Sequence, residues 1–392
     1  MSGYTLADGV TLKNKLGATD EDVLAELEVR EVRARLLEIE LGAGPTGQFD
    51  AEHLRAIHRH LFQDVYEWAG HTRDERVPLP DGTVASEPIL RKPEGQPFLI
   101  GPAIPAALAD IAAKLREADN LRGLPREEFA ERAADVMVEL NAVHPFREGN
   151  GRSQRAFIQE LAREAGHTLD FSIVSRERMV QASVAAHEHG DLSMMRRLFD
   201  EISDPARVAL LRESIGMLEK LEFKWNDHYV ATIAPGHSVN LVFAGIAGDQ
   251  FMARTQSDIL FGRTSELPKP HPKRDEQFTL TLPPRAYAET SHERPLSSNE
   301  ILASANDPVL RQRYLKEEQR REDQIKSAAP TPVTAERAAA RGKVPGEKQA
   351  EYEKFVSDHN GDKFVRELDD DHSREREHGR PGGKGGRGGR GR

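Results

Sequence analysis

Apolar residues recur at helical spacing through the first 205 residues of the chain. Within 50–66 they lie three or four positions apart, on one face of a helix: Leu54, Ile57, Leu61 and Val65. Similar stripes predict helices at 20–40, 105–116, 126–141, 151–165, 176–186 and 192–202. The pattern therefore predicts a mainly α-helical domain over residues 1–205.

Residues 70–100 interrupt this helical pattern. They contain eight prolines or glycines among short extended runs, and these two residue types break helices. We predict a long loop or a β-hairpin here. Connections of this length usually serve a function.

Beyond residue 205 the period of the pattern changes from that of a helix to that of a strand. One more helix is predicted at 206–221, and runs with alternating apolar residues follow it at 229–233, 238–244, 250–255, 258–262 and 277–282. Five short strands predict a small closed, OB-like β-barrel. We place this second domain at 206–290.

Composition sets the end of the chain apart. The 92 residues from 301 to 392 contain 20 Lys or Arg, 17 Asp or Glu and only four aromatic residues. Such a segment buries too little apolar surface to offset the entropy of ordering it. We therefore predict a disordered charged tail over 291–392, ending in a basic Gly/Arg stretch at 381–392.

Several functional classes are disfavoured. The chain has no cysteine, which excludes disulfides, thiol catalysis and cysteine zinc sites. The net charge of −10 argues against nucleic acid as a partner, and the Gly/Arg terminus lacks aromatic residues for base stacking. The N-terminus lacks the apolar core of a secretory signal, and the longest apolar stretch, 98–108, contains two prolines. We expect a cytoplasmic protein without membrane insertion.

The segment 141–157, NAVHPFREGNGRSQRAF, combines several features of a catalytic loop. A helix ends before Pro145, because proline disfavours the helical conformation of the residue that precedes it. The glycines of Gly149-Asn150-Gly151 permit a tight turn, and a second helix follows at once. A turn that leads into a helix N-terminus directs backbone N–H groups at one point, which favours an anion such as phosphate.

The charged side chains of this segment suit phosphate chemistry. Arg152 and Arg155 lie three positions apart and could both reach phosphate oxygens. Glu148, beside the turn, is the type of ligand that holds Mg²⁺ next to phosphates. His144 has a pKa suited to removing a proton from a hydroxyl group.

Each of these features has an ordinary structural interpretation as well. Gly-Asn-Gly is a common turn, most His-Pro pairs only end a helix, and two arginines at this spacing usually form a solvated face. Their order and compactness favour a functional site. The nearby histidines His53, His58 and His60 do not suit a metal site, because His58 and His60 point to different faces of a helix.

The stretch HPFREGNGRSQR, residues 144–155, resembles the signature motif of the Fic family at every specified position. The segments LKNKLG at 12–17, HLRAIHRHLFQDVYEWAG at 53–70 and GPAIPAAL at 101–108 also resemble a Fic domain, so that the resemblance covers roughly residues 1–205. It implies a Fic-type helical fold with a β-hairpin flap, within 70–100, that holds a target segment. The region of short strands resembles the small barrel of type IV secretion effectors and conjugation-associated toxins.

The resemblance implies a protein adenylyltransferase that moves AMP from ATP to a Ser, Thr or Tyr hydroxyl and releases pyrophosphate. It implies His144 as the base and Glu148 as the Mg²⁺ ligand. Gly149, Asn150 and Gly151 would bind phosphates, with Asn150 aimed at the α-phosphate. Arg152 would contact the β- and γ-phosphates and Arg155 the γ-phosphate, while Phe146 would point into the core. A glutamate at the metal position argues against a kinase-like variant.

The resemblance also bears on regulation and partners. Many Fic proteins carry an inhibitory helix with a (Ser/Thr)-x-x-x-Glu-(Gly/Asn) motif, whose glutamate pairs with the second motif arginine. In this chain only Glu94 and Glu148 precede Gly or Asn, and neither fits the motif. We therefore expect a separate small antitoxin protein. A type IV secretion coupling protein that reads the basic terminus, with translocation into a recipient or host cell, is a further hypothesis.

Two classes of function stay open from the sequence. The first is the adenylylating enzyme described above. The alternative is a catalytically weak Fic-fold scaffold or effector that acts by protein binding, or an enzyme that transfers another nucleotide.

Overall fold

The computed structural model describes residues 3–90, 98–236 and 238–283. All of these residues except Arg122–Leu124 belong to one compact unit. The predicted disordered tail at 291–392 lies outside the described residues. None of the described helices is both long and apolar enough to span a bilayer.

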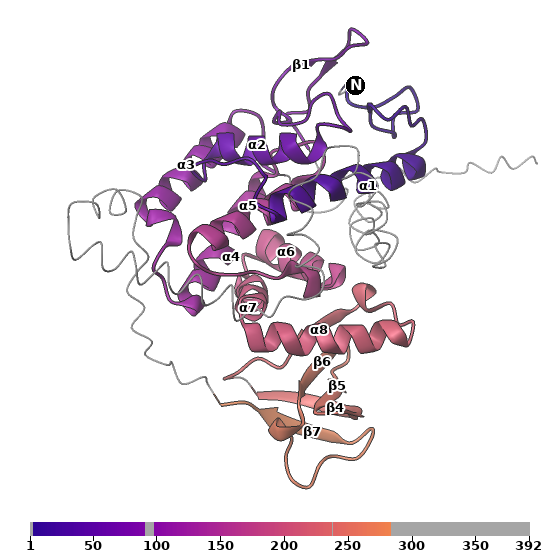
Figure 1. The fold of residues 1–392 in the computed structure, drawn as a ribbon, viewed down its shortest axis with the longest axis vertical. Coiled ribbons are helices and arrows are strands. Elements are labelled where there is room, and N and C mark those ends of the chain that lie inside the picture. Colours follow the sequence, from indigo (N-terminus) through magenta and orange to yellow (C-terminus); the bar gives the residue numbers. More distant parts are fainter. Residues whose placement is uncertain (1–2, 91–97, 237, 284–392) are drawn as a thin grey trace, which may run out of the picture. The chain divides into compact units, whose positions relative to one another are not determined.

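Eight α-helices appear in the described residues, close to the predicted positions (Figure 1). Their bounds are α1 Glu21–Glu40, α2 Ala51–Phe62, α3 Ala103–Glu117, α4 Arg126–Val143, α5 Asn150–Glu164, α6 Arg176–His189, α7 Ser193–Ile202 and α8 Pro205–Lys220. Short 3₁₀ turns occur at Asp119–Leu121, Phe171–Ile173, Trp225–Asp227 and Thr264–Glu266.

Helix α4 lies at the centre of the helical part, where it packs against α3, α5, α6 and α7. Its buried side chains are Phe129, Ala130, Ala133, Ala134, Met137, Leu140 and Val143. Helix α5 buries Ala156, Phe157, Ile158 and Leu161 and packs against α2 and α4. The segment that joins α4 to α5 is the predicted catalytic loop, so two core helices fix its ends.

A small antiparallel hairpin forms within the Pro/Gly-rich segment. Strand β1, Val77–Pro78, pairs with β2, Val84–Ala85, with Val77 opposite Ala85. The expected hairpin is therefore confirmed, and its role as a flap for a target segment stays a prediction.

The five predicted strands of the C-terminal part are confirmed. They are β3 Tyr229–Thr232, β4 Ser238–Ala247, β5 Gln250–Arg254, β6 Asp258–Arg263 and β7 Gln277–Thr281. The sheet has the order β3-β6-β5-β4-β7, and its β3–β6 pair is parallel. Its core contains Leu241, Phe243, Phe251, Ala253, Leu260 and Leu280. Strands β3 and β7 end the order, and closure into an OB-like barrel stays a prediction.

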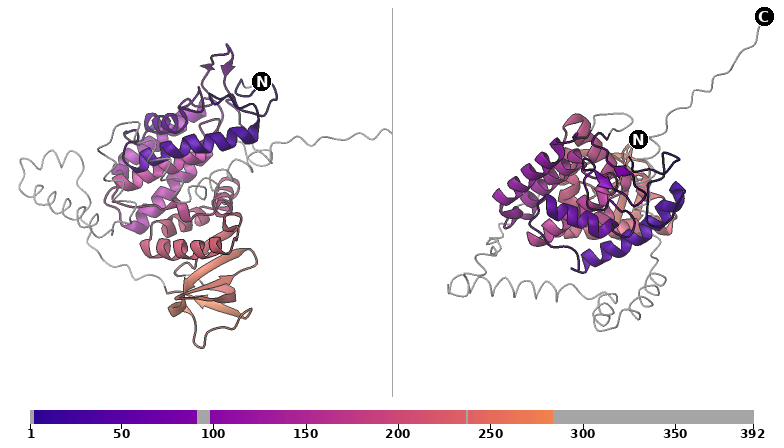
Figure 2. Two further views of the ribbon diagram at one scale, coloured as in Figure 1. Left: turned by 45° about the vertical axis from the view of Figure 1, so that its right-hand side comes forward. Right: turned by 90° about the horizontal axis from the view of Figure 1, so that it is seen from above.

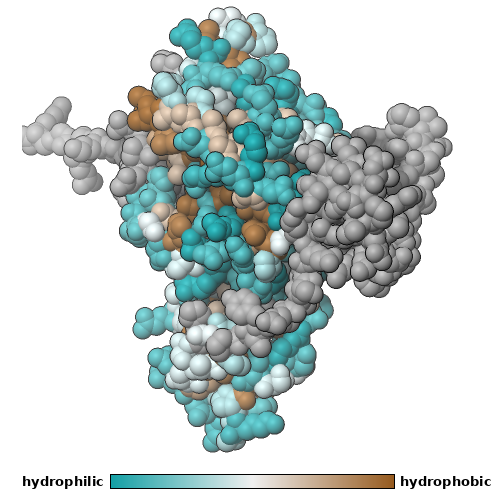
Figure 3. Space-filling view, turned by 90° about the vertical axis from the view of Figure 1, so that its left-hand side faces the viewer, coloured by the Kyte–Doolittle hydropathy of each residue, from teal (hydrophilic) through white to brown (hydrophobic). Residues whose placement is uncertain are grey.

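Helix α8 joins the helical part to the sheet. It contacts β3 and β6 and lies beside the sheet in Figures 1 and 2. The helix begins at Pro205, where the Asp204 carboxylate accepts from the N–H groups of Ala206 and Arg207. Residues on both sides of 205/206 belong to the same compact unit, and the predicted domain boundary at this position stays a prediction. Figure 3 shows that the described surface on one side is mostly hydrophilic, with apolar side chains gathered in patches.

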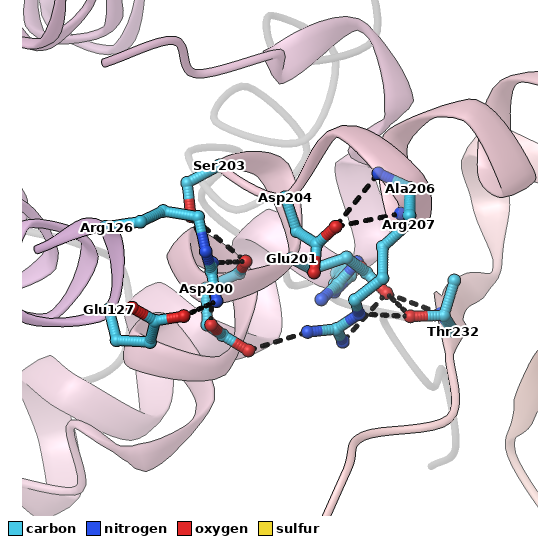
Figure 4. A network of polar contacts seen from close by, with 10 residues as sticks. Arg126, Glu127, Asp200, Glu201, Ser203, Asp204, Ala206, Arg207 and Thr232 are labelled. Atoms are coloured by element: carbon cyan, nitrogen blue, oxygen red, sulfur yellow. Dashed lines mark hydrogen bonds and ion pairs between the residues drawn. The ribbon is translucent and has the colours of Figure 1, made fainter. Parts of the chain in front are cut away.

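A buried carboxylate binds several elements together at this junction (Figure 4). Glu201 of α7 is fully buried and accepts from Arg178 of α6, from Arg207 of α8 at 3.2 Å and from the backbone N–H of Thr232 in β3 at 2.6 Å. Burial alone would raise the pKa of Glu201, but the two arginines outweigh this effect and lower the pKa. The charge on Glu201 is therefore part of the folded structure.

Neutralising Glu201 should destabilise the protein strongly. We expect Glu201→Gln to lower the free energy of unfolding by about 3–5 kcal/mol, because it leaves two buried arginines without their shared carboxylate. Urea unfolding of the full chain measures this change. The control is Asp275→Asn, which alters an exposed pair with Arg254 at 3.4 Å and should cause no measurable change. Equal effects of the two substitutions would contradict the prediction.

Candidate active site

His144 occupies the C-cap of α4 in a left-handed conformation, with φ 46° and ψ 62°. Its N–H donates to the carbonyl of Leu140 at 3.0 Å, and Pro145 prevents the helix from continuing. The imidazole is 8% exposed and stacks on the ring of Phe98, with centroids 3.9 Å apart and an interplanar angle of 12°. The structure thus holds the predicted base in one defined orientation at the end of a core helix.

The side chain of Asn150 closes the loop between α4 and α5. Its Oδ1 accepts from the N–H of Phe146 at 2.9 Å, and its Nδ2 donates to the carbonyl of Phe146 at 2.9 Å. The resemblance implies that this side chain faces the α-phosphate, which stays a prediction, and in the structure both of its amide atoms bond to the backbone. The physical reason is that a buried amide needs partners for its donors and its acceptor. Phe146 is fully buried, as the resemblance implies.

Gly149 is the N-cap of α5, and Gly151 lies in the first turn of that helix. Gly149 has φ 80°, a conformation that favours glycine. A Cβ atom at this position would lie 2.3 Å from the ring of Phe62, so no larger residue fits here without a shift of that ring. Helix α5 starts at Asn150, so its first backbone N–H groups lie where the sequence predicts an anion site.

The carboxylate of Glu148 lies at this same turn. Its Oε1 accepts from the N–H of Gly149 at 2.8 Å and contacts Nη2 of Arg152 at 3.3 Å. The side chain is 16% exposed. A partly exposed carboxylate therefore lies beside the start of α5.

The two motif arginines differ in their surroundings. Arg152 is 5% exposed, pairs with Glu28 of α1 at 2.5 Å and lies over the ring of Phe62, 4.7 Å from its centroid. Burial lowers the pKa of Arg152, but the carboxylates of Glu28 and Glu148 outweigh this effect and raise it. Arg155 is only half-buried. The predicted shared face thus contains one buried and one half-buried arginine.

Sequence reasoning missed Glu28. The residue is fully buried, and besides Arg152 it accepts a hydrogen bond from the hydroxyl of Tyr66. Burial raises the pKa of Tyr66, and the charge on Glu28 raises it further, so the phenol keeps its proton. The signal was available in the pattern: Glu28 stands between Leu24 and Val32 at four-residue spacing, within the apolar stripe of a helix.

His58 of α2 packs against the loop between α4 and α5. Its ring stacks on Phe146 at 3.8 Å, its Nε2 donates to the carbonyl of Glu148 at 3.0 Å, and its Nδ1 accepts from the N–H of Gly70 at 2.8 Å. This pattern requires the neutral ring with its proton on Nε2. Burial lowers the pKa of His58 to about 3.

The neighbouring histidines do not join His58. His53 lies 3.0 Å from Glu160, and His60 lies 3.0 Å from Glu38. The three histidines therefore have three different sets of partners.

Comparison with known proteins identifies the fold of this site. The model of the Fic/DOC family matches residues 48–162, which include α2, α3, α4, the loop and most of α5. The probable protein adenylyltransferase y4lH of Sinorhizobium fredii is 38% identical over 184 residues, covering 46% of this chain and 85% of that protein. The chain belongs to the Fic/DOC family. The matched region contains every predicted site residue.

Longer Fic proteins match more of the chain. A protein adenylyltransferase of Bartonella henselae is 34% identical over 284 residues, or 71% of this chain and 52% of that protein. The adenylyltransferase VbhT of Bartonella schoenbuchensis is 39% identical over 196 residues, or 50% of this chain and 37% of that protein. The chain thus spans about half or less of the length of these two relatives.

Solved structures of similar proteins agree with this family assignment. The type IV secretion system effector BepA superposes with a TM-score of 0.66 at 34% identity, covering 72% of this chain and 97% of that one. The N-terminal Fic domain of an effector from Bartonella quintana, solved with ADP, has a TM-score of 0.50 at 38% identity and covers 53% of this chain and 97% of that one.

The buried neutral His58 should make stability depend on pH. Its folded pKa of about 3 lies below the ordinary value of about 6.5 for the unfolded chain, so its contribution is complete above that value and decreases as the pH falls. Replacement by glutamine removes this dependence. The difference in unfolding free energy between the wild type and His58→Gln should shrink by about 2 kcal/mol from pH 7 to pH 5. Urea unfolding at both pH values measures it, and a constant difference would contradict the prediction.

Proposed function

We propose that this Fic protein transfers AMP from ATP to a Ser, Thr or Tyr hydroxyl of a target protein and releases pyrophosphate. One observation carries the proposal: a single short loop holds the imidazole of His144 at the end of α4 and the glycine turn at the start of α5. The proposed base and the proposed phosphate site thereby lie at the two ends of one loop. The names of the relatives, protein adenylyltransferases, support the same reaction.

The proposed reaction is an in-line displacement at the α-phosphorus. The ATP phosphates bind at the N-terminus of α5, where backbone N–H groups and the helix dipole favour negative charge. His144 accepts the proton of the target hydroxyl, and the hydroxyl oxygen forms a bond to the α-phosphorus. The bond from that phosphorus to the oxygen bridging to the β-phosphate breaks, and pyrophosphate leaves. Orientation of the two reactants accounts for much of the rate.

Glu148 is the residue that would hold Mg²⁺. Carboxylates are suitable ligands, and a protein commonly binds Mg²⁺ through one or two carboxylates together with substrate phosphates. Glu148 has a partly exposed carboxylate at the turn, which fits this role. When bound, Mg²⁺ neutralises negative charge on the phosphates.

The arginines would act differently from each other. A phosphate that contacts Arg152 must compete with Glu28, which pairs with this guanidinium in the structure. Arg155 is the more accessible of the two, and we assign it to the γ-phosphate. Arg152 then contributes mainly through Glu148, whose carboxylate it contacts.

We further propose a small antitoxin protein as the inhibitor, since the sequence lacks an inhibitory motif of its own. The likeness to the type IV secretion system effector BepA supports translocation by such a system, and we propose that a coupling protein reads the basic terminus. The alternative function, a Fic scaffold that acts by binding alone, keeps the same fold and differs in having no transfer activity.

Loss of His144 should abolish transfer and spare nucleotide binding. We expect His144→Ala to lower the rate of labelling by about 10²–10⁴-fold, because it removes the base and leaves the phosphate site. The assay uses the full chain with α-labelled ATP, Mg²⁺ and a lysate as the source of target, and calorimetry measures ATP affinity. The control His189→Ala, at the exposed end of α6, should behave as the wild type.

Three results would overturn the assignment. Full labelling by His144→Ala would remove His144 from the reaction. Label that appears from γ-labelled ATP would indicate phosphate transfer instead of AMP transfer. Nucleotide binding without any labelling by the wild type would favour the scaffold.

A further inference from the structure

Arg73 is a fully buried arginine whose guanidinium binds only to main-chain carbonyls among the described residues. The residue lies between α2 and the β1–β2 hairpin. An arginine side chain has five N–H donors, and the structure records five acceptors. They are the carbonyls of His144 at 2.8 Å, Glu87 at 3.3 Å, Pro88 at 2.9 Å, Val143 at 3.4 Å and Leu99.

These five carbonyls come from three segments that are distant in sequence. Val143 and His144 end helix α4, Glu87 and Pro88 follow the hairpin, and Leu99 precedes α3. Leu99 is next to Phe98, the residue whose ring stacks on the imidazole of His144. One side chain therefore holds both the backbone of His144 and the segment that covers its ring.

The backbone of Arg73 joins the same segments. Its N–H donates to the carbonyl of Pro145 at 2.8 Å, and its carbonyl accepts from the N–H of Glu87 at 2.7 Å. The side chains of Arg147 and Glu87 add an ion pair at 2.7 Å. The guanidinium thus stands at a point where the catalytic loop and the end of the hairpin meet.

The positive charge suits this position. The carbonyls at the C-terminus of a helix carry partial negative charge, and Val143 and His144 end α4. Burial lowers the pKa of Arg73, while the carboxylates of Asp74 and Glu87 act in the opposite direction. An arginine keeps its proton under such conditions and a lysine loses it more readily.

We propose that Arg73 is a positioning residue for His144: it fixes the carbonyl of the base and, through Leu99, the ring of Phe98 against the imidazole. The kinetic part of this inference rests on the proposed AMP transfer. The geometric part concerns only the orientation of the imidazole and can be tested without activity.

The first experiment replaces Arg73 by lysine, which has three donors in place of five and a different shape. We expect Arg73→Lys to lower the rate constant at saturating ATP at least tenfold and to leave ATP affinity unchanged, since the phosphate site lies at the start of α5. The matched control is Arg178→Lys, another fully buried arginine, which binds Glu201. It should lower the melting temperature and leave the rate constant of the folded protein unchanged.

A second variant covers the case in which Arg73→Lys does not fold. Phe98→Leu keeps Arg73 and removes the ring that stacks on His144. We expect the same kinetic result, a lower rate constant at unchanged ATP affinity. A wild-type rate constant in either folded variant, or an equal loss in Arg178→Lys, would overturn the proposal.

NMR of the histidine ring protons supplies the readout that does not depend on activity. The stacked ring of Phe98 should shift the Cε1 proton of His144 upfield, and loss of one signal in His144→Ala assigns it. This signal should move toward the unstacked position in Arg73→Lys and Phe98→Leu, and stay in place in Arg178→Lys. An unmoved signal in folded Arg73→Lys would refute the positioning role. An inactive wild type with the expected shifts would refute only the proposed function.

Discussion

The geometry of the whole site depends on one side-chain amide, that of Asn150, which holds the backbone of Phe146 by its N–H and by its carbonyl. These two hydrogen bonds set the distance between the end of α4 and the start of α5. Because both helices pack in the core, they cannot adjust to a looser loop. The imidazole of His144 and the first N–H groups of α5 are therefore held at the two ends of one short loop.

Buried charges hold this arrangement in place. Arg73 binds carbonyls, Arg152 binds Glu28, and Arg178 binds Glu201, each at a position where apolar residues of similar size could fill space. Such groups often contribute little net stability, because desolvation offsets the attraction between charges. Their contribution is to specify geometry. The N–H donors of a planar guanidinium have fixed directions, so all of them are satisfied only when the surrounding acceptors are arranged in one way.

The sequence predicted the elements well and their long-range partners poorly. Apolar stripes located the eight helices and the five sheet strands, because the spacing of buried residues is a local property. The motif 144–155 located the loop for the same reason. The pairing of Glu28 with Arg152, and of Arg73 with Leu99, joins residues far apart in the chain, so no local spacing encodes it. The hydrogen bonds of the Asn150 amide to the backbone of Phe146 were likewise not predicted, because they depend on how the loop folds back on itself.

The contact between Gly149 and Phe62 has a consequence for how this family can vary. A methyl group at 149 would require a smaller residue at 62, because the space is already filled. The ring of Phe62 also lies against the guanidinium of Arg152, so the compensating change would expose that charge to a new cavity. The effect of a substitution at 149 therefore depends on the residue at 62. A change at either position alone should destabilise the protein before the second change is made. We therefore expect positions 149 and 62 to vary less in sequence than the residues around them.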